Sequence, residues 1–274
     1  MRRLLLVSLA VIALAFAALL FGYSTATSDP VVRRATMRLD SLPPGAEPVR
    51  IVLISDIHVA GPDMPPARLE RIVRQINGLL PDLVLIAGDL ISEKRLSTRL
   101  YSMADAIRPL SGLKPRIGSF VVLGNHDHWF DAPGARTALR AAGVRLLDNE
   151  AVQAGPVALG GIDDDFTEHS DVSGTVRRIL ALNGPRILLS HSPDPFPDLP
   201  PTIDLMVAGH THCGQVALPY FGPIKTMSRY GKRYACGLIR EGGKTLVVTA
   251  GLGTSGIPLR LVAVPDMWLI ELRR

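Results

Sequence analysis

The chain of 274 residues is 47% hydrophobic and only 20% charged, which excludes an intrinsically disordered protein. Its two cysteines, Cys213 and Cys236, are too few for a disulfide scaffold or a cysteine-rich zinc module. The 30 lysines and arginines exceed the 25 aspartates and glutamates, and this basic balance favours anionic partners: phosphates, nucleic acid or acidic lipid headgroups.

The N-terminal segment is predicted to enter a membrane. Residues 4–23 carry no charge and are almost all Leu, Ala, Val, Ile or Phe. At about 1.5 Å per residue, such a helix spans a hydrocarbon core of about 30 Å. We therefore predict a membrane anchor over 1–26. A cleaved signal peptide is the alternative, although its apolar region usually has only about 7–15 residues.

The charges that flank this segment bear on its orientation. Arg2 and Arg3 favour a cytoplasmic N-terminus and an extracytoplasmic location for the rest of the chain. Arg33, Arg34 and Arg38 follow on the other side and weaken this bias. We therefore expect a membrane-anchored protein whose larger part lies outside the cytoplasm, with the opposite orientation as the alternative.

The remaining chain is predicted to form one α/β domain over 49–274, reached through a polar, proline-containing linker over 27–48. Strands are expected over 50–55, 83–87, 119–123, 157–161, 186–190 and 204–208, and helices over 65–80, 96–110 and 132–142. Only strands follow toward the C-terminus, over 236–240, 244–249, 259–264 and 267–272. Early alternation followed by strands alone predicts mixed sheets with helices outside.

Side chains able to bind metal follow five of these apolar runs. They are Asp56 with His58, Asp89, Asn125, His191, and His210 with His212. Open α/β sheets place ligands beyond the carboxyl ends of their strands, so these five ends can meet at one crevice. Residues two apart in extended backbone point to the same side, so each Asp–His or His–His pair can present two ligands together. Oxygen and imidazole ligands suit Mn, Fe, Zn, Co or Ni.

Each of these residues, taken alone, also has a structural explanation. An aspartate after a strand is often a turn residue or a helix cap, and a buried histidine is often only hydrogen-bonded. All five clusters occur in chain order, and each one follows an apolar run. This recurrence favours the metal interpretation over five independent structural ones.

The five clusters also resemble a known family. The segments DIH (56–58), GD (88–89), GNHD (124–127), SH (190–191) and GHTH (209–212) resemble the five-block signature of calcineurin-like metallophosphoesterases. The flanking segments LLSHSPD, GIDD and GHTHCGQVALP resemble the membrane-associated bacterial subgroup of YkuE- and YaeI-like phosphoesterases. The resemblance covers about residues 50–272. It implies an α/β fold of two packed mixed sheets flanked by helices, with two divalent metal ions.

Carried over by position, the resemblance implies which residues hold these metals. The first ion takes Asp56, His58, Asp89 and His212, and the second takes Asp89, Asn125, His191 and His210. His126 matches the family's catalytic histidine, a general acid that protonates the leaving oxygen after in-line attack by a hydroxide held between the metals. Asp127 either orients His126 or serves a structural turn.

Cys213 departs from this subgroup, which usually has glycine after GHTH. Our default expectation is a small buried side chain with no role. A disulfide with Cys236 is the alternative in an oxidising compartment. Asp163–Asp165 is a run of carboxylates, for which we favour an exposed turn over a supporting role at the metal site.

A stretch from Leu205 to Arg240 contains no acidic residue. Within it, Arg229, Lys232 and Arg233 are candidates for a basic rim that binds substrate phosphate or lipid headgroups, with a solvated loop as the alternative. Basic residues interleaved with aromatics also suit single-stranded nucleic acid, but the membrane segment argues against that partner.

These observations predict a membrane-anchored phosphodiesterase with two divalent metals, for which lipid-linked phosphoesters are one candidate substrate class. A pyrophosphatase of the UDP-diacylglucosamine type, acting in lipid A synthesis, is a narrower alternative. A membrane-tethered metal-binding module without turnover is the alternative of another class. His126 argues against that module, because metal binding alone does not require it.

Overall fold

Two mixed sheets form the centre of the fold in a computed structural model that describes residues 2–94, 96–218, 222–223 and 225–274. The first sheet has the order β1 (Val31–Arg38), β14 (Asp266–Arg273), β2 (Val49–Ile54), β3 (Leu83–Ala87), β4 (Gly118–Val122) and β5 (Arg145–Leu146). The second has the order β12 (Gly237–Glu241), β13 (Lys244–Val248), β9 (Leu205–Ala208), β8 (Arg186–Leu189), β7 (Val157–Gly161) and β6 (Glu150–Ala154). A short hairpin pairs β10 (Ala217–Leu218) with β11 (Gly222–Pro223).

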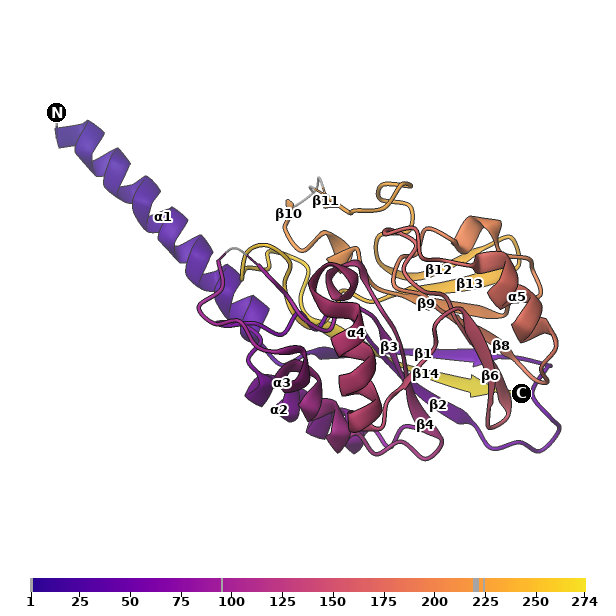
Figure 1. Ribbon diagram of the computed structural model, residues 1–274. Coiled ribbons are helices and arrows are strands. Elements are labelled where there is room, and N and C mark those ends of the chain that lie inside the picture. Colours follow the sequence, from indigo (N-terminus) through magenta and orange to yellow (C-terminus); the bar gives the residue numbers. More distant parts are fainter. Residues whose placement is uncertain (1, 95, 219–221, 224) are drawn as a thin grey trace.

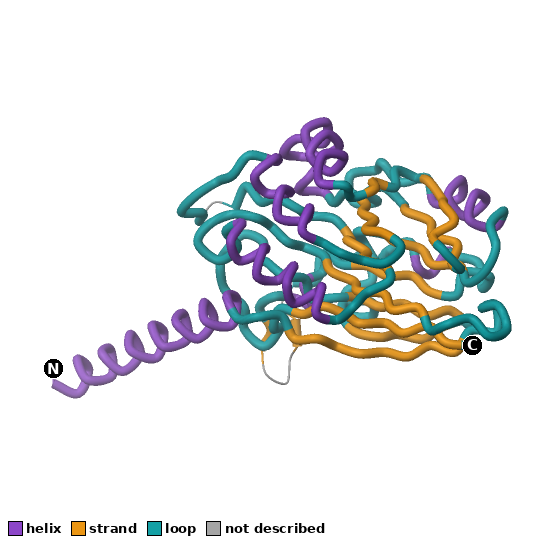
Figure 2. The backbone as a smooth tube through the Cα atoms, turned by 90° about the horizontal axis from the view of Figure 1, so that it is seen from below, coloured by secondary structure: helices purple, strands orange, loops and turns teal. Residues whose placement is uncertain are grey.

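Helices cover the outer faces of this pair of sheets (Figures 1 and 2). They are α2 (Pro66–Gly78), α3 (Met103–Ile107), α4 (Asn125–Ala142) and α5 (Val172–Leu180), with short 3₁₀ turns η1 (Arg108–Gly112), η2 (Phe196–Asp198) and η3 (His212–Gly214). The fold class expected from the sequence, two packed mixed sheets flanked by helices, is therefore confirmed.

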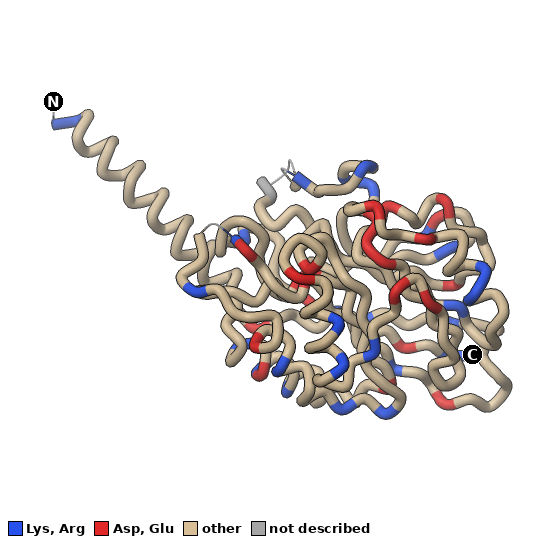
Figure 3. The backbone as a smooth tube through the Cα atoms, in the orientation of Figure 1, with Lys and Arg blue, Asp and Glu red and all other residues tan. Residues whose placement is uncertain are grey.

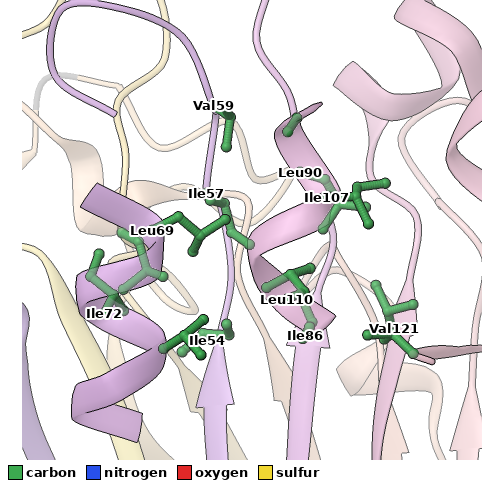
Figure 4. Packing of buried hydrophobic residues seen from close by; sticks show 14 of the residues in the cluster. Ile54, Ile57, Val59, Leu69, Ile72, Ile86, Leu90, Ile107, Leu110 and Val121 are labelled. Carbon is green, nitrogen blue, oxygen red and sulfur yellow. The ribbon is translucent and has the colours of Figure 1, made fainter. Parts of the chain in front are cut away.

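The strands at the centre are apolar on both faces. Along β2, Ile51 and Leu53 join the cluster between the two sheets, while Val52 and Ile54 join the cluster beneath the helices. Figure 4 shows Ile54 in that second cluster with Ile72 of α2. Such two-sided burial explains why β2, β3 and β4 are near-continuous apolar runs rather than alternating ones.

Parallel pairing places the functional ends of these strands together. In the first sheet β2, β3 and β4 are parallel, and in the second β7, β8, β9 and β13 are parallel. Their carboxyl ends consequently lie at one edge of each sheet, which is where open α/β folds bind ligands.

Several predicted elements differ from the observed ones. The helix expected over 65–80 is confirmed as α2, but the one expected over 96–110 begins only at Met103, where Ser102 Oγ caps it by accepting a hydrogen bond from the Asp105 amide. The helix expected over 132–142 is the second half of α4, which starts at Asn125 and is kinked at Asp131. In place of the strand over 259–264, isolated bridges join Val216 to residues 261 and 262.

The segment expected as a linker differs most. Residues 31–38 form β1, which pairs in parallel with β14 from Val31 opposite Asp266 to Arg38 opposite Arg273. Met37 is its only buried side chain. Because the other positions of this edge strand are more exposed and many are polar, the sequence lacks the apolar pattern that would predict a strand.

The N-terminal helix α1 (Arg2–Thr27) projects away from the domain, and its charges are confined to its start (Figures 1 and 3). It is long and apolar enough to cross a membrane. Only Gly22 and Ala26, near its end, are buried.

Candidate metal centre

The seven predicted metal ligands meet at the carboxyl ends of the strands. Asp56 and His58 follow β2, Asp89 follows β3, Asn125 begins α4, His191 follows β8, and His210 and His212 follow β9. All seven are buried, none being more than 6% exposed. Segments far apart in the chain thus deliver two carboxylates, an amide and four imidazoles to one place.

The first ligand group surrounds His58. Its Nε2 lies 3.1 Å from His212 Nε2 and 3.4 Å from Asp89 Oδ2. His212 Nε2 in turn lies 3.4 Å from Asp56 Oδ1. These four side chains are the ones that the family resemblance assigned to the first ion.

The second ligand group surrounds His191. Its Nε2 lies 3.3 Å from Asp89 Oδ2, 3.1 Å from Asn125 Oδ1 and 3.1 Å from His210 Nδ1. The other ring nitrogen, Nδ1, lies 2.7 Å from the Ala87 carbonyl oxygen and donates to it, which leaves Nε2 as the ligand atom. Asp89 Oδ2 therefore belongs to both groups.

The chemistry of these atoms fits divalent cations. The rings of His58 and His212 stack with an interplanar angle of 17°, which turns two Nε2 atoms toward each other, and His58 Nδ1 is buried with no partner among the described residues. Burial lowers the pKa of both histidines well below its ordinary value and lowers the pKa of His210 to about 3. His191 differs: although burial opposes the shift, the charge of Asp89 and the hydrogen bond to it raise the pKa of His191 well above its ordinary value. Imidazoles and carboxylates in contact are the donor set that a divalent cation requires, and binding of the cation displaces the proton.

The backbone at these ligands is unusual. Asp56, His58, Asp89, His210 and His212 all have left-handed φ angles, between 48° and 68°. Extended backbone therefore does not explain the i, i+2 spacing, and that part of the sequence argument is wrong. Asp56 and His58 still join one group, but His210 and His212 diverge into different groups.

Gly209 permits the closest approach in the centre. A β-carbon on this residue would lie 2.2 Å from Ser55 Oγ and 2.4 Å from Asp56 Oδ2. The absence of a side chain lets the end of β9 cross directly over Asp56, and the next amide, that of His210, donates to Asp56 Oδ2 at 3.0 Å.

His126 lies beside the ligands. Its amide donates to Asp89 Oδ1 at 2.9 Å, its ring meets that of His58 edge-on with centroids 4.8 Å apart, and its Nδ1 lies 3.0 Å from Glu93 Oε1. Burial alone would lower the pKa of His126, but the hydrogen bond to Glu93 and the charge of Asp89 raise it above its ordinary value. Sequence reasoning missed Glu93, because this residue lies in a loop without a motif of its own.

Asp127 contacts backbone amides. Its Oδ1 accepts from the Leu90 amide at 2.8 Å and its Oδ2 from the Gly124 amide at 3.0 Å. It thereby joins the segments that carry Asp89 and Asn125. Of the two roles considered for Asp127, these contacts support the structural one.

The carboxylate run after β7 is not the exposed turn that was expected. Asp163 and Asp164 are only 4% and 0% exposed. Asp163 Oδ1 lies 2.9 Å from His128 Nε2, and Asp164 Oδ2 accepts from the Thr167 amide at 2.8 Å. These contacts partner one oxygen of each of the two buried carboxylates, whereas Asp164 Oδ1 has no partner among the described residues and Asp165 is half-buried.

The three residues of the predicted basic rim have different surroundings in the structure. Arg229 is paired with Asp165 at 2.7 Å and with Asp194 at 3.3 Å, and Arg233 is paired with Glu241 at 2.8 Å. Lys232 is exposed. A different cation, Lys225, lines the cavity of about 450 Å³ beside the ligands, together with His126 and Trp129.

Cys213 and Cys236 form a disulfide. Cys213 is buried, as the default expectation had it, but it is not a side chain without a role, and the alternative of a disulfide with Cys236 is confirmed. The bond joins the residue after His212 to the residue directly before β12.

Comparison with known proteins agrees with this geometry. The model of the family "Calcineurin-like phosphoesterase" matches residues 49–214. A "transmembrane protein with metallophosphoesterase domain" from Danio rerio is 34% identical over 272 residues, which cover 93% of this chain and 60% of the relative. The uncharacterized metallophosphoesterase YkuE of Bacillus subtilis (strain 168) is 30% identical over 265 residues, which cover 92% of this chain and 90% of YkuE.

Among solved structures, a 5'-nucleotidase precursor from Thermus thermophilus is similar at 16% identity and a TM-score of 0.46, over 82% of this chain and 55% of that chain. Compared with the two relatives named above, the chain spans only about 60% of the length of the Danio rerio protein and 90% of the length of YkuE.

Proposed function

Because the chain belongs to the calcineurin-like phosphoesterase family and is a metal-dependent phosphoesterase, we propose that it hydrolyses phosphodiesters beside a membrane with two divalent cations. One observation carries the proposal. Asp89 Oδ2 lies 3.4 Å from His58 Nε2 and 3.3 Å from His191 Nε2, so a single carboxylate serves both ligand groups. A shared carboxylate is the arrangement expected where two cations act on one phosphoryl group.

In this proposal each ligand group holds one ion. Asp56, His58 and His212 hold the first, Asn125, His191 and His210 hold the second, and Asp89 is shared. When bound, two such cations neutralise the charge of the phosphoryl group and lower the pKa of a water that attacks phosphorus. Mn, Fe, Zn, Co and Ni all suit this donor set.

His126 delivers a proton to the leaving oxygen. Glu93 accepts a hydrogen bond from Nδ1, which leaves Nε2 for the leaving group and stabilises the doubly protonated ring. Although burial opposes the shift, the hydrogen bond to Glu93 and the charge of Asp89 raise the pKa of His126, which favours the protonated ring that a general acid needs. Glu93 therefore positions His126 and does not itself contact the substrate.

The cavity favours a diester over a simple phosphate. It has a volume of about 450 Å³ and is lined by Trp129, Val216 and Met227 as well as by the ligands. Lys225 is the cation that lines it among the described residues. Apolar walls of this size leave room for an organic group on the phosphate. Substrate binding by Arg229, Lys232 and Arg233 stays a prediction.

The chain is anchored by α1, and we place the catalytic domain outside the cytoplasm. The disulfide between Cys213 and Cys236 supports that side, because disulfides persist in oxidising compartments. The apolar length of α1 and the transmembrane relative support the anchor. Lipid-linked phosphodiesters are then among the substrates within reach.

The test is hydrolysis by the full chain in detergent after metal removal and reloading. We expect bis(p-nitrophenyl) phosphate to be cleaved with Mn²⁺ and not after chelation, and to be preferred over p-nitrophenyl phosphate. Asp89→Asn should abolish the activity, whereas the control Asp40→Asn, at an exposed turn, should not. Turnover that survives chelation, or a preference for the monoester, would contradict the proposal.

A further inference from the structure

The end of α1 is fastened to the catalytic domain rather than hinged to it. The Gly22 carbonyl accepts a hydrogen bond from the Arg260 amide at 3.0 Å, and a β-carbon on Gly22 would meet the side chains of Leu261 and Leu259 at 3.3 and 3.4 Å. Arg68 Nη2 donates to the Ser28 carbonyl at 2.7 Å. We call residues 22–27 the foot of α1.

The length of α1 places this foot at the level of the lipid headgroups. Its 26 residues measure about 39 Å at 1.5 Å per residue. A hydrocarbon core of about 30 Å uses about 20 of them, which is the length of the uncharged stretch 4–23. The foot begins where this stretch ends, so the loop that packs on Gly22 lies at the membrane surface as well.

Two loops beside the foot expose apolar side chains. Leu96 and Leu100 are 61% and 52% exposed, and Ile257 and Val262 are 39% and 61% exposed. We call these four residues the collar. In the view of Figure 1 both loops lie near the end of α1 that meets the domain. The loop 96–100 is held there through Gly61, which exchanges hydrogen bonds with Thr98 and Arg99, and the loop 257–262 packs on Gly22.

The backbone holds one collar residue outward against its preference. Val262 has a φ of 76°, in the left-handed region that a β-branched residue rarely adopts. Among the charged residues near the collar, Arg99 is exposed and lies 4.9 Å from the centroid of the Tyr101 ring, whereas Asp29, next to the foot, is paired with Arg71 at 3.3 Å.

We propose that the collar is a membrane-docking surface, with Leu96, Leu100, Ile257 and Val262 inserted among the lipid headgroups around the foot of α1. This rests on the anchoring part of the proposed function and is independent of catalysis. Continuity with the apolar helix identifies the bilayer as the occupant, because a surface at the level of the headgroups meets lipid before any other partner. Tyr23, in the foot and 37% exposed, is a residue type enriched at the same depth.

Docking would also orient the active site. Gln215, which lines the cavity, donates from Nε2 to the Ser255 and Ile257 carbonyls at 3.0 and 3.1 Å and accepts from the Ser255 amide at 2.8 Å. The cavity wall and the collar loop therefore form one unit. A bilayer that holds the collar fixes the height of the cavity above the lipid.

The test uses the full chain in vesicles of phosphatidylcholine and phosphatidylglycerol. The variants Val262→Cys and Leu100→Cys are each labelled with an environment-sensitive, thiol-reactive fluorophore. The two native cysteines do not react with it because they form a disulfide. Leu80→Cys is the matched control: Leu80 is 70% exposed, has a left-handed φ of 52°, and lies at the far end of α2 from Arg68, about 20 Å away along the helix. Flotation of the vesicles reports anchoring, and quenching by brominated lipids reports docking.

We expect the emission maxima of the labels at positions 262 and 100 to shift to the blue, and brominated lipid to quench most of their emission. The label at position 80 should stay unquenched. Flotation with equal, weak quenching at all three positions would overturn the collar and leave the anchor standing. Equal, strong quenching would also overturn it, since the domain would then adsorb without orientation. Protein that fails to float would overturn the anchor and the collar together.

Discussion

Gly209→Ala tests whether close backbone contact positions the metal ligands. The added β-carbon would lie 2.2 Å from Ser55 Oγ and 2.4 Å from Asp56 Oδ2, whereas ordinary contact begins at 3.4 Å. Either Asp56 or the His210 segment must therefore move by about 1 Å, and a misplacement of that size costs about 10²-fold in rate. We expect kcat/KM on a chromogenic diester to fall by about 10²-fold and the metal content to fall with it.

Two variants show whether the loss arises from this contact. Gly78→Ala is the control, because a β-carbon at Gly78 meets nothing within 4 Å, and it should leave activity and metal content unchanged. Adding Ser55→Gly to Gly209→Ala removes one of the two obstructions and should restore part of the activity. Thermal unfolding identifies a variant that has merely lost its fold. A folded Gly209→Ala enzyme with wild-type kcat/KM and metal content would refute the reasoning.

Three further predictions concern side chains around the centre. His126→Ala should keep its metals while kcat falls by about 10²–10⁴-fold, less for p-nitrophenolate than for alkoxide leaving groups, and Glu93→Gln should show the same contrast more weakly; equal losses for both leaving groups would exclude proton delivery. Asp89→Asn should lose metal and activity together, as measured by elemental analysis and turnover. The Asp163 hydrogen bond raises the pKa of His128, and, although burial opposes it, the same bond lowers the pKa of Asp163. Their pairing therefore stabilises the fold fully between about pH 4 and 6.5. This stabilisation is lost as pH rises through the raised pKa of His128 or falls through the lowered pKa of Asp163. Urea unfolding should show His128→Gln destabilised more at pH 5.5 than at pH 8.5, and an equal effect at both would contradict the ion pair.

The clustering of the seven candidate metal ligands was predictable because each of them follows a strong local signal. Asp56, Asp89 and His191 come directly after apolar runs that had to be strands, and parallel strands of one sheet bring their ends to one edge. The left-handed backbone at the ligands had no such signal. Asp56 and His210 adopt φ angles that favour glycine, and the burial of the strands behind them, not local preference, holds these turns.

Contacts between segments that are far apart in the chain could not be predicted from the sequence. Val31 pairs with Asp266 across almost the whole chain, so β1 looked like polar connecting sequence. Glu93 reaches His126 from a loop whose apolar residues suggested a helix over 96–110; those residues, Leu96 and Leu100, are exposed instead. Helical periodicity identified an apolar face but not the partner that covers it.

Arg260 contacts both the foot of α1 and the backbone around Asp56, and this link affects which substrates can reach the active site. The Arg260 amide holds the foot of α1 through Gly22, and its buried guanidinium donates to the carbonyls of Ala250 and Gly253 at 2.7 and 2.6 Å. Between them, Gly251 packs so tightly on Asp56 that a β-carbon there would lie 2.5 Å from that of Asp56. A flexible linker would let the domain sample a range of heights above the bilayer. The hydrogen bonds at the foot, together with β1, remove that freedom. In the proposed function, a phosphodiester therefore has to reach the cavity at the height that the foot of α1 sets.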